Sequence, residues 1–231
     1  MRLIRRAQER GHFDHGWLNA YHTFSFGNYY DPQQMGFRSL RVINEDRVQP
    51  GRGFGRHGHR DMEILTYVLE GVLEHQDSLG HVEQLRAGEL QRMTAGSGIQ
   101  HSEYNPSPND TVHLYQIWIE PRQTGLTPEY EQRQFNPEAR QGVFQLVASS
   151  DGRDGSMIIH QDTDIYLGRT NSDHPLRHSL DGHEAWLQVI RGTVDAGSQR
   201  LEVGDGMATN EQLDLQSVDD AEVMLFEFTG K

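Results

Sequence analysis

The chain has 231 residues, of which 35% are hydrophobic and 24% are charged, and its formal net charge is −13. This acidic balance argues against direct binding to nucleic acid or to an anionic membrane surface, because both need a basic protein surface. The sequence has no cysteine, which excludes disulfides, thiolate metal sites and a cysteine nucleophile.

The sequence shows no membrane or export signal. The first 17 residues are basic but lack the apolar core that secretory signals carry. No apolar run approaches the roughly 20 residues that a transmembrane helix needs. We therefore expect a cytoplasmic protein with no membrane partner.

Short apolar runs, rich in β-branched and aromatic residues, recur along the chain and are separated by Gly, Asn and Asp. Runs of this kind are typical of β-strands, and many short strands with glycine turns predict an all-β sandwich or barrel. A short helical turn is predicted at 128–133, inside a connector that spans 120–142. The predicted strands are 39–43, 63–69, 112–119, 143–147, 185–190 and 223–228.

One segment of the sequence is repeated. Residues 63–71 align with residues 184–192, since each segment has a Glu, then a predicted strand, then a Gly eight positions after the Glu. Each copy continues to a turn glycine, Gly88 in the first and Gly204 in the second. The repeat predicts two related β domains, at 1–125 and 126–231.

Two short motifs carry the chemistry of the first copy: His57-Gly-His59 and His101-Ser-Glu103. Side chains at positions i and i+2 of an extended segment point to the same face. Two such pairs brought opposite each other would place three imidazoles and one carboxylate around one point. Nitrogen and oxygen donors of this kind bind divalent transition metals.

The repeat makes this metal prediction asymmetric. In the second copy, the positions that match the four candidate ligands hold His178, Leu180, Ser217 and Asp219. Leu180 cannot bind a metal, and Ser217 is a poor ligand. We therefore expect one metal site, in the N-terminal domain, and a degenerate C-terminal domain without metal.

The two motifs resemble the paired signatures of the cupin superfamily. The first signature is matched by Gly51, His57, His59, Glu63 and Gly71, with one extra residue before the last glycine. The second runs from Gly88 through Gly96 and Gly98 to His101, with Thr94 in place of the usual proline.

Further strings resemble the pirin family of bicupins, and within it the bacterial pirin-like quercetinases. These strings are His22-Thr-Phe-Ser-Phe26, Asn28-Tyr-Tyr-Asp31, the segment 53–63, the segment 93–98 and His101-Ser-Glu103. The resemblance implies an all-β bicupin fold made of two double-stranded β-helix domains. It also implies a mononuclear metal held by His57, His59, His101 and Glu103, without Glu63.

The resemblance further implies a quercetin 2,3-dioxygenase, which cleaves quercetin or a related flavonol with O2 and releases CO. Fe(II) is the favoured metal, and Ni, Cu, Co, Mn or Zn would also suit the donors. Glu103 is the candidate base that takes the proton of the substrate's 3-hydroxyl. Glu63 is expected to orient a ligand histidine.

Aromatic and apolar side chains near the ligand strands are the expected cavity walls: Phe54, Met62, Met93, Tyr104, His113, Tyr115 and Trp118. His22 is expected to serve packing. The remaining histidines are expected to be solvated or to cap turns: His12, His15, His75, His81, His160, His174 and His183. A monomer is expected, because two cupin units in one chain can pack on each other as separate subunits do.

Two other functions remain open at this point. The chain could be a metal-dependent or redox-sensing regulator that acts through protein partners, or it could run a different metal-assisted reaction. An open aromatic pocket beside the metal site would favour an enzyme, whereas a filled pocket beside an exposed apolar patch would favour a regulator.

Overall fold

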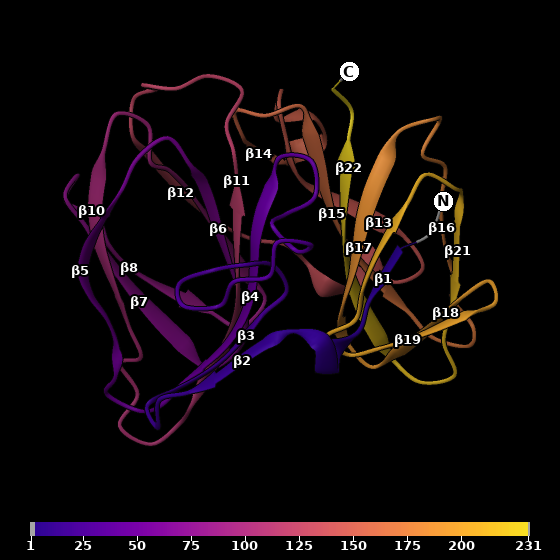
Figure 1. Cartoon of the computed structure of the whole chain (residues 1–231), viewed down its shortest axis with the longest axis horizontal. Coiled ribbons are helices and arrows are strands. Elements are labelled where there is room, and N and C mark those ends of the chain that lie inside the picture. The colour runs from indigo at the N-terminus through magenta and orange to yellow at the C-terminus, as the bar shows by residue number, and fades with distance from the viewer. Residues whose placement is uncertain (1–2, 231) are drawn as a thin grey trace. The chain divides into compact units, whose positions relative to one another are not determined.

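The computed structural model describes residues 3–230, which form β-strands and three short 3-10 turns (Figure 1). The strands group into an N-terminal unit, residues 11–135, and a C-terminal unit, residues 3–10 together with 136–230. Each unit contains one seven-stranded and one four-stranded sheet. No helix of the described residues has the length and apolar character needed to cross a membrane.

In the N-terminal unit the larger sheet has the strand order β12-β9-β6-β11-β4-β3-β2, and the smaller sheet has the order β5-β10-β7-β8. Figure 1 shows the two sheets facing each other, from indigo to magenta. The strands are β2 (Gly11–Asp14), β3 (Leu18–His22), β4 (Leu40–Val48), β5 (Gly53–His59), β6 (Glu63–Glu70), β7 (Val72–Asp77), β8 (Val82–Arg86), β9 (Glu89–Thr94), β10 (Ile99–Tyr104), β11 (Val112–Ile119) and β12 (Glu129–Gln134).

The core of this unit lies between its two sheets. Val48 and Leu114 of the larger sheet pack in one buried cluster with Leu73 and Leu85 of the smaller sheet. Burial of this apolar surface holds the sheets together. The two sequence motifs lie on β5 and β10, which are neighbouring strands of the smaller sheet. Packing of the two sheets therefore fixes the position of the candidate ligands.

The C-terminal unit repeats this architecture, with a larger sheet β1-β20-β17-β22-β15-β13-β14 and a smaller sheet β16-β21-β18-β19. Its strands are β1 (Leu3–Arg5), β13 (Phe144–Ser149), β14 (Met157–Ile158), β15 (Thr163–Thr170), β16 (Leu176–His178), β17 (Glu184–Arg191), β18 (Thr193–Ala196), β19 (Gln199–Glu202), β20 (Gly206–Thr209), β21 (Leu213–Gln216) and β22 (Ala221–Phe228). The 3-10 turns are η1 (Ala7–Glu9), η2 (Pro137–Arg140) and η3 (Arg153–Gly155).

The repeat found in the sequence is a structural repeat. Its two copies are β6 and β17, which pair with β11 and β22 respectively. The glycines that end the copies, Gly71 and Gly192, have φ of +78° and +70° and lie against the starts of β11 and β22. A Cβ at Gly192 would come within 2.6 Å of the Asp220 carbonyl oxygen, so a side chain there would clash with backbone.

Three sequence predictions need correction. The segment 128–133 is not a helical turn but strand β12, because it pairs with β9 along Glu129–Gln134. The strand predicted at 39–43 continues to Val48. The division expected at 125/126 falls instead at 135/136, and residues 3–10 join the second unit because β1 pairs with β20.

Candidate metal centre and its cavity

The four candidate ligands lie on two paired strands of the smaller sheet. His57 and His101 are direct partners across β5 and β10, and a register shift between His101 and Glu103 re-aims the end of β10. The imidazole ring centroids are 4.4 Å apart for His57 and His101, and 4.8 Å apart for His57 and His59. Each of the three histidines offers a nitrogen within 4.8 Å of the others. The structure thus brings the predicted histidines together.

Hydrogen bonds fix which nitrogen of His101 faces the centre. Asp77 Oδ2 lies 3.1 Å from His75 Nε2, so this nitrogen carries the proton and donates it. His75 Nδ1 is then an acceptor, and His101 Nδ1–H donates to it at 3.5 Å. The remaining nitrogen, His101 Nε2, is buried and has no hydrogen-bond partner among the described residues. Its lone pair is therefore available to a metal.

The same logic applies to His57. Its Nδ1–H donates to the Gly55 carbonyl oxygen at 2.7 Å, which leaves the lone pair on Nε2. Burial, with the nearby His57 and His75 rings, lowers the pKa of His101 to about 3. Burial, with His101 and His57, lowers the pKa of His59 to about 4. Neutral imidazoles with free lone pairs are the form that binds metal, so the donors fit a divalent transition metal.

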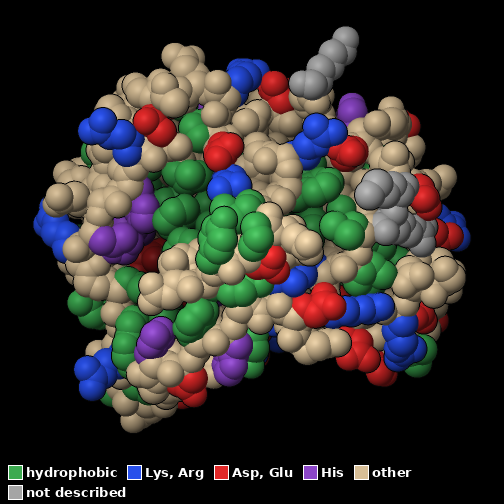
Figure 2. Space-filling view, in the orientation of Figure 1, with side chains coloured by type: hydrophobic (Ala, Val, Ile, Leu, Met, Phe, Trp, Pro, Cys, Tyr) green, Lys and Arg blue, Asp and Glu red, His purple; other side chains and the backbone are tan. Residues whose placement is uncertain are grey.

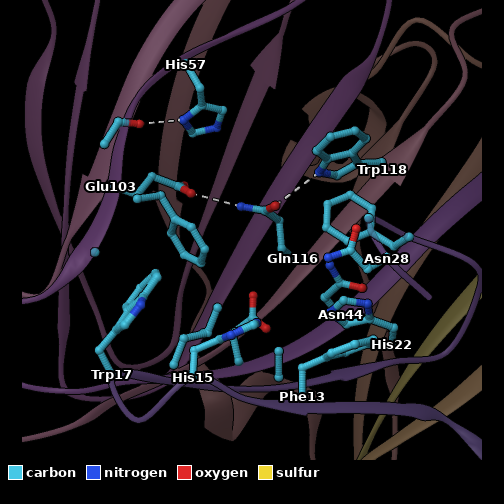
Figure 3. A pocket seen from close by; sticks show the side chains of 18 of the residues that line it. Phe13, His15, Trp17, His22, Asn28, Asn44, His57, Glu103, Gln116 and Trp118 are labelled. Atoms are coloured by element: carbon cyan, nitrogen blue, oxygen red, sulfur yellow. Dashed lines mark hydrogen bonds between the residues drawn. The ribbon is translucent and has the colours of Figure 1, made fainter.

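Glu103, the fourth candidate ligand, is 1% exposed, and its carboxylate lies in a group with His75 and His101 rather than with His57 and His59. One carboxylate oxygen accepts a hydrogen bond from Gln116 Nε2 at 2.9 Å, and the other accepts one from Thr66 Oγ1 at 3.4 Å. Gln116 is itself oriented by Trp118, whose Nε1–H donates to the amide oxygen at 3.2 Å (Figure 3). A carboxylate has about four lone pairs, so these bonds leave Glu103 able to bind a metal or a proton.

His75 is the residue whose role the sequence prediction missed. It was expected to be solvated, yet it is fully buried and lies with His101 and Glu103 in a second possible ligand group. Both of its nitrogens are already bonded, to Asp77 and to His101, so it orients the candidate ligand His101 and offers no lone pair of its own. Asp77 also accepts from His81, whose side chain is 37% exposed, which extends this chain of groups to the surface.

Glu63 accepts a hydrogen bond from another strand of the larger sheet. It is fully buried, and its carboxylate accepts a hydrogen bond from Thr94 Oγ1 at 3.0 Å. Thr94 in turn accepts one from Arg92 at 2.9 Å. Orientation of a ligand histidine by Glu63 stays a prediction.

A cavity of about 550 Å³ opens beside the candidate ligands. Figure 2 shows histidine side chains gathered at a hollow on this face, with hydrophobic side chains beside it. The volume is that of a typical small-molecule site. The aromatic walls are Phe13, Trp17, Phe26, Phe54 and Trp118, and the lining also includes His15, His22, Asn44, Asp46, His57, His59, Glu103 and Gln116 (Figure 3).

Two of the expected wall residues, Phe54 and Trp118, line this cavity. The others lie elsewhere: Met62 and Met93 pack around Ile64, Tyr115 is buried, His113 bonds to Glu45, and Tyr104 is 42% exposed. Phe13, His15 and Trp17 were missed because they come from β2 and its loop, far from the motifs in sequence. His22 and Phe26 also line the cavity, and the string that resembles pirins already contained them.

A row of polar side chains crosses the inner face of the larger sheet. Register places Gln116 opposite Asn44 on β4 and opposite Thr66 on β6. His22 lies opposite Asn44 on the other side. Two residues further along β4 is Asp46, which is 4% exposed. Its burial, with the charges of Glu103 and Glu45, raises the pKa of Asp46 to about 8.

In the C-terminal unit, the residues at the positions of the candidate ligands form other hydrogen bonds or belong to the core. His178 bonds to Glu227 at 2.7 Å, Leu180 lies in the hydrophobic core, and Ser217 Oγ donates to the Thr193 carbonyl oxygen. By register, the counterparts of Thr66 and Gln116 are Leu187 and Leu225, which belong to the same core. Within the described part of this unit, no three potential ligands come together as they do in the N-terminal unit.

The two units define a bicupin. In the C-terminal unit His178 and His183 both bond to Glu227, but among the described residues the groups of three mutually close donor atoms all lie in the N-terminal unit. A family model described as Pirin matches residues 3–119, and one described as Quercetinase C-terminal cupin domain matches residues 146–228. The chain belongs to the pirin family.

The chain is similar to several known proteins and to a solved structure. The chain is 51% identical to the quercetin 2,3-dioxygenase of Escherichia coli strain K12, over 98% of both chains, and 40% identical to a putative quercetin 2,3-dioxygenase of Pseudomonas aeruginosa, over 97% of this chain and 99% of the relative. The crystal structure of the bacterial pirin YhhW from Escherichia coli in complex with nickel(II) has 50% identity, full coverage of both chains and a TM-score of 0.94.

Proposed function

We propose that the chain is a metal-dependent dioxygenase that cleaves quercetin or a related flavonol with O2 and releases CO. The observation that carries this proposal is an open aromatic cavity of about 550 Å³ whose lining includes His57, His59 and Glu103. A flat polyphenol suits such walls, and the donor set offers it a metal. The relatives named quercetin 2,3-dioxygenase support the same reaction.

We propose His57, His59, His101 and Glu103 as the metal ligands, with Fe(II) as the favoured metal. Ni, Cu, Co, Mn and Zn also suit these donors, and the nickel(II) complex of the related bacterial pirin supports binding of such an ion. A bound divalent metal would act as a Lewis acid that lowers the pKa of a substrate hydroxyl.

The residues of the chain then supply position and proton transfer. Phe13, Trp17 and Trp118 exclude water and hold the aromatic rings of the substrate. Glu103 accepts the proton of the 3-hydroxyl, and the hydrogen bonds from Gln116 and Thr66 keep its carboxylate in place. Both atoms of O2 enter the ring-opened product and one carbon leaves as CO, so the reaction needs no added reductant.

The C-terminal unit, in this proposal, is a scaffold without metal, since leucines fill the positions of Thr66 and Gln116. We also propose a cytoplasmic monomer whose partners are the flavonol and O2. The net charge of −13 supports the absence of a direct nucleic-acid partner.

A regulator that acts through protein partners is the alternative. The open cavity favours the enzyme, because a regulator has no need of a substrate-sized space beside the ligands. The test is to reconstitute the metal-free protein anaerobically with each candidate metal and then add quercetin and O2. Loss of flavonol absorbance with CO release supports the proposal, and no turnover with any of these metals would refute it.

A further inference from the structure

Two polar side chains on the cavity lining each have a buried oxygen without a partner in the described chain. Asn44 and Asp46 lie two residues apart on β4, on the same face of the strand, and both line the cavity. They are 2% and 4% exposed. The Oδ1 atom of each is fully buried and has no hydrogen-bond partner among the described residues. Buried polar groups in proteins are normally hydrogen-bonded, so these two need an explanation.

The fold itself does not require a carboxylate at Asp46. Asp46 pairs with Leu114, and the corresponding pair in the C-terminal unit is Gly168 with Val223. There the space is filled by apolar side chains, since a Cβ at Gly168 would lie 2.9 Å from Leu176 Cδ1. The same framework is thus built with glycine and leucine at this place. Burial of the Asp46 carboxyl group without a hydrogen-bond partner costs free energy, and a bound ligand would supply the missing hydrogen bond.

The surroundings indicate which ligand chemistry fits. Aromatic walls flank the pair, so the ligand carries aromatic rings. Asp46 accepts hydrogen bonds, and the amide of Asn44 both donates and accepts. Glu103 lines the same cavity, and its charge would repel an anionic group. Phenolic hydroxyls are neutral, lie on aromatic rings, and donate and accept in the same way as the two side chains require.

We propose that Asn44 and Asp46 form a subsite that binds phenolic hydroxyls of the substrate other than the one that meets the metal. The subsite rests on the proposed function and adds a specificity to it: the protein selects polyhydroxylated flavonols over flavonols with the 3-hydroxyl alone. A site built to hydrogen-bond a hydroxyl discriminates strongly against analogues that lack it, because its polar groups are then left unpaired.

The test measures binding without turnover. Metal-loaded protein is titrated anaerobically with quercetin and with 3-hydroxyflavone, which keeps only the hydroxyl next to the carbonyl, and the ratio of the two Kd values is the readout. We expect the wild type to prefer quercetin at least tenfold. Asp46→Leu and Asn44→Leu reduce the ratio at least fivefold, Asp46→Asn reduces it less, and binding of 3-hydroxyflavone changes about twofold or less. Asp110→Asn, in an exposed loop, leaves the ratio unchanged.

A ratio that stays at the wild-type value in folded Asp46→Asn and Asn44→Leu overturns the subsite, as does a wild type without preference for quercetin. Metal content gives a second readout: all variants keep their metal, because neither residue is a proposed ligand. The outcome is separable from that of the proposed function. Selective binding that depends on Asp46, with no CO formed in air, upholds the subsite and refutes the dioxygenase.

Discussion

Replacement of His75 by phenylalanine tests whether the hydrogen bond between His75 and His101 strengthens metal binding. His75 Nδ1 is the acceptor that holds His101 Nδ1–H, at 3.5 Å, and thereby turns His101 Nε2 toward the other ligands. His75→Phe removes this acceptor but keeps a flat ring that stacks on Tyr130, where the centroids are 4.7 Å apart. Asp77 keeps its bonds to His81 and to the backbone of Leu79. The fold is therefore expected to survive.

Loss of such an outer partner typically weakens metal affinity about 10- to 100-fold. This range corresponds to about 1.4–2.8 kcal/mol of binding free energy. The assay is a competition titration of metal-free protein with Ni(II) and a chromophoric chelator. The matched control is His81→Phe, which changes the exposed side of Asp77 and leaves the bond between His75 and His101 intact, so its affinity stays within about twofold of wild type. An equal affinity of folded His75→Phe and wild type would refute the orienting role.

Three further outcomes are expected. Gln116→Leu, which places the residue found at Leu225 of the other unit, removes the 2.9 Å hydrogen bond to Glu103. We expect kcat for quercetin to fall about 10- to 150-fold, because a hydrogen bond to a charged group contributes about 1.5–3 kcal/mol. An unchanged kcat would show that this hydrogen bond does not affect the reaction. His59→Ala loses bound metal whereas His178→Ala retains it, as measured by elemental analysis, and the reverse result would place the centre in the C-terminal unit. In metal-free protein at pH 6, His59 and His101 stay neutral because their folded pKa values, about 4 and about 3, lie below that pH; NMR titration that finds either ring protonated at pH 6 would contradict this.

The apolar runs predicted the centres of the strands well, because burial on both faces leaves a continuous hydrophobic pattern. The end of β4 was missed for a physical reason. Its residues 44–47 are polar because Asn44 and Asp46 line a cavity rather than the core. Strand β12 was mistaken for a helical turn because its sequence is charged and polar, and only its pairing with β9 makes it a strand.

The candidate ligands could be predicted because spacing of two along a strand is a local signal. The cavity could not, since its walls come from strands that are distant in sequence. His75 was missed for the same reason: its importance follows from its place between Asp77 and His101, which only pairing of β7 with β10 creates. The repeat was informative because both copies keep the framework while Leu180 stands in the second copy at the position of the candidate ligand His59.

The most direct test of the account measures CO release as a function of metal bound. Metal-free protein is reconstituted with increasing Fe(II) under anaerobic conditions and then mixed with quercetin and O2. The account predicts a rate that rises with occupancy and saturates at one metal per chain, with His101→Ala inactive at every metal concentration. Full activity without metal, or in metal-treated His101→Ala, would contradict the claim that this centre performs the cleavage.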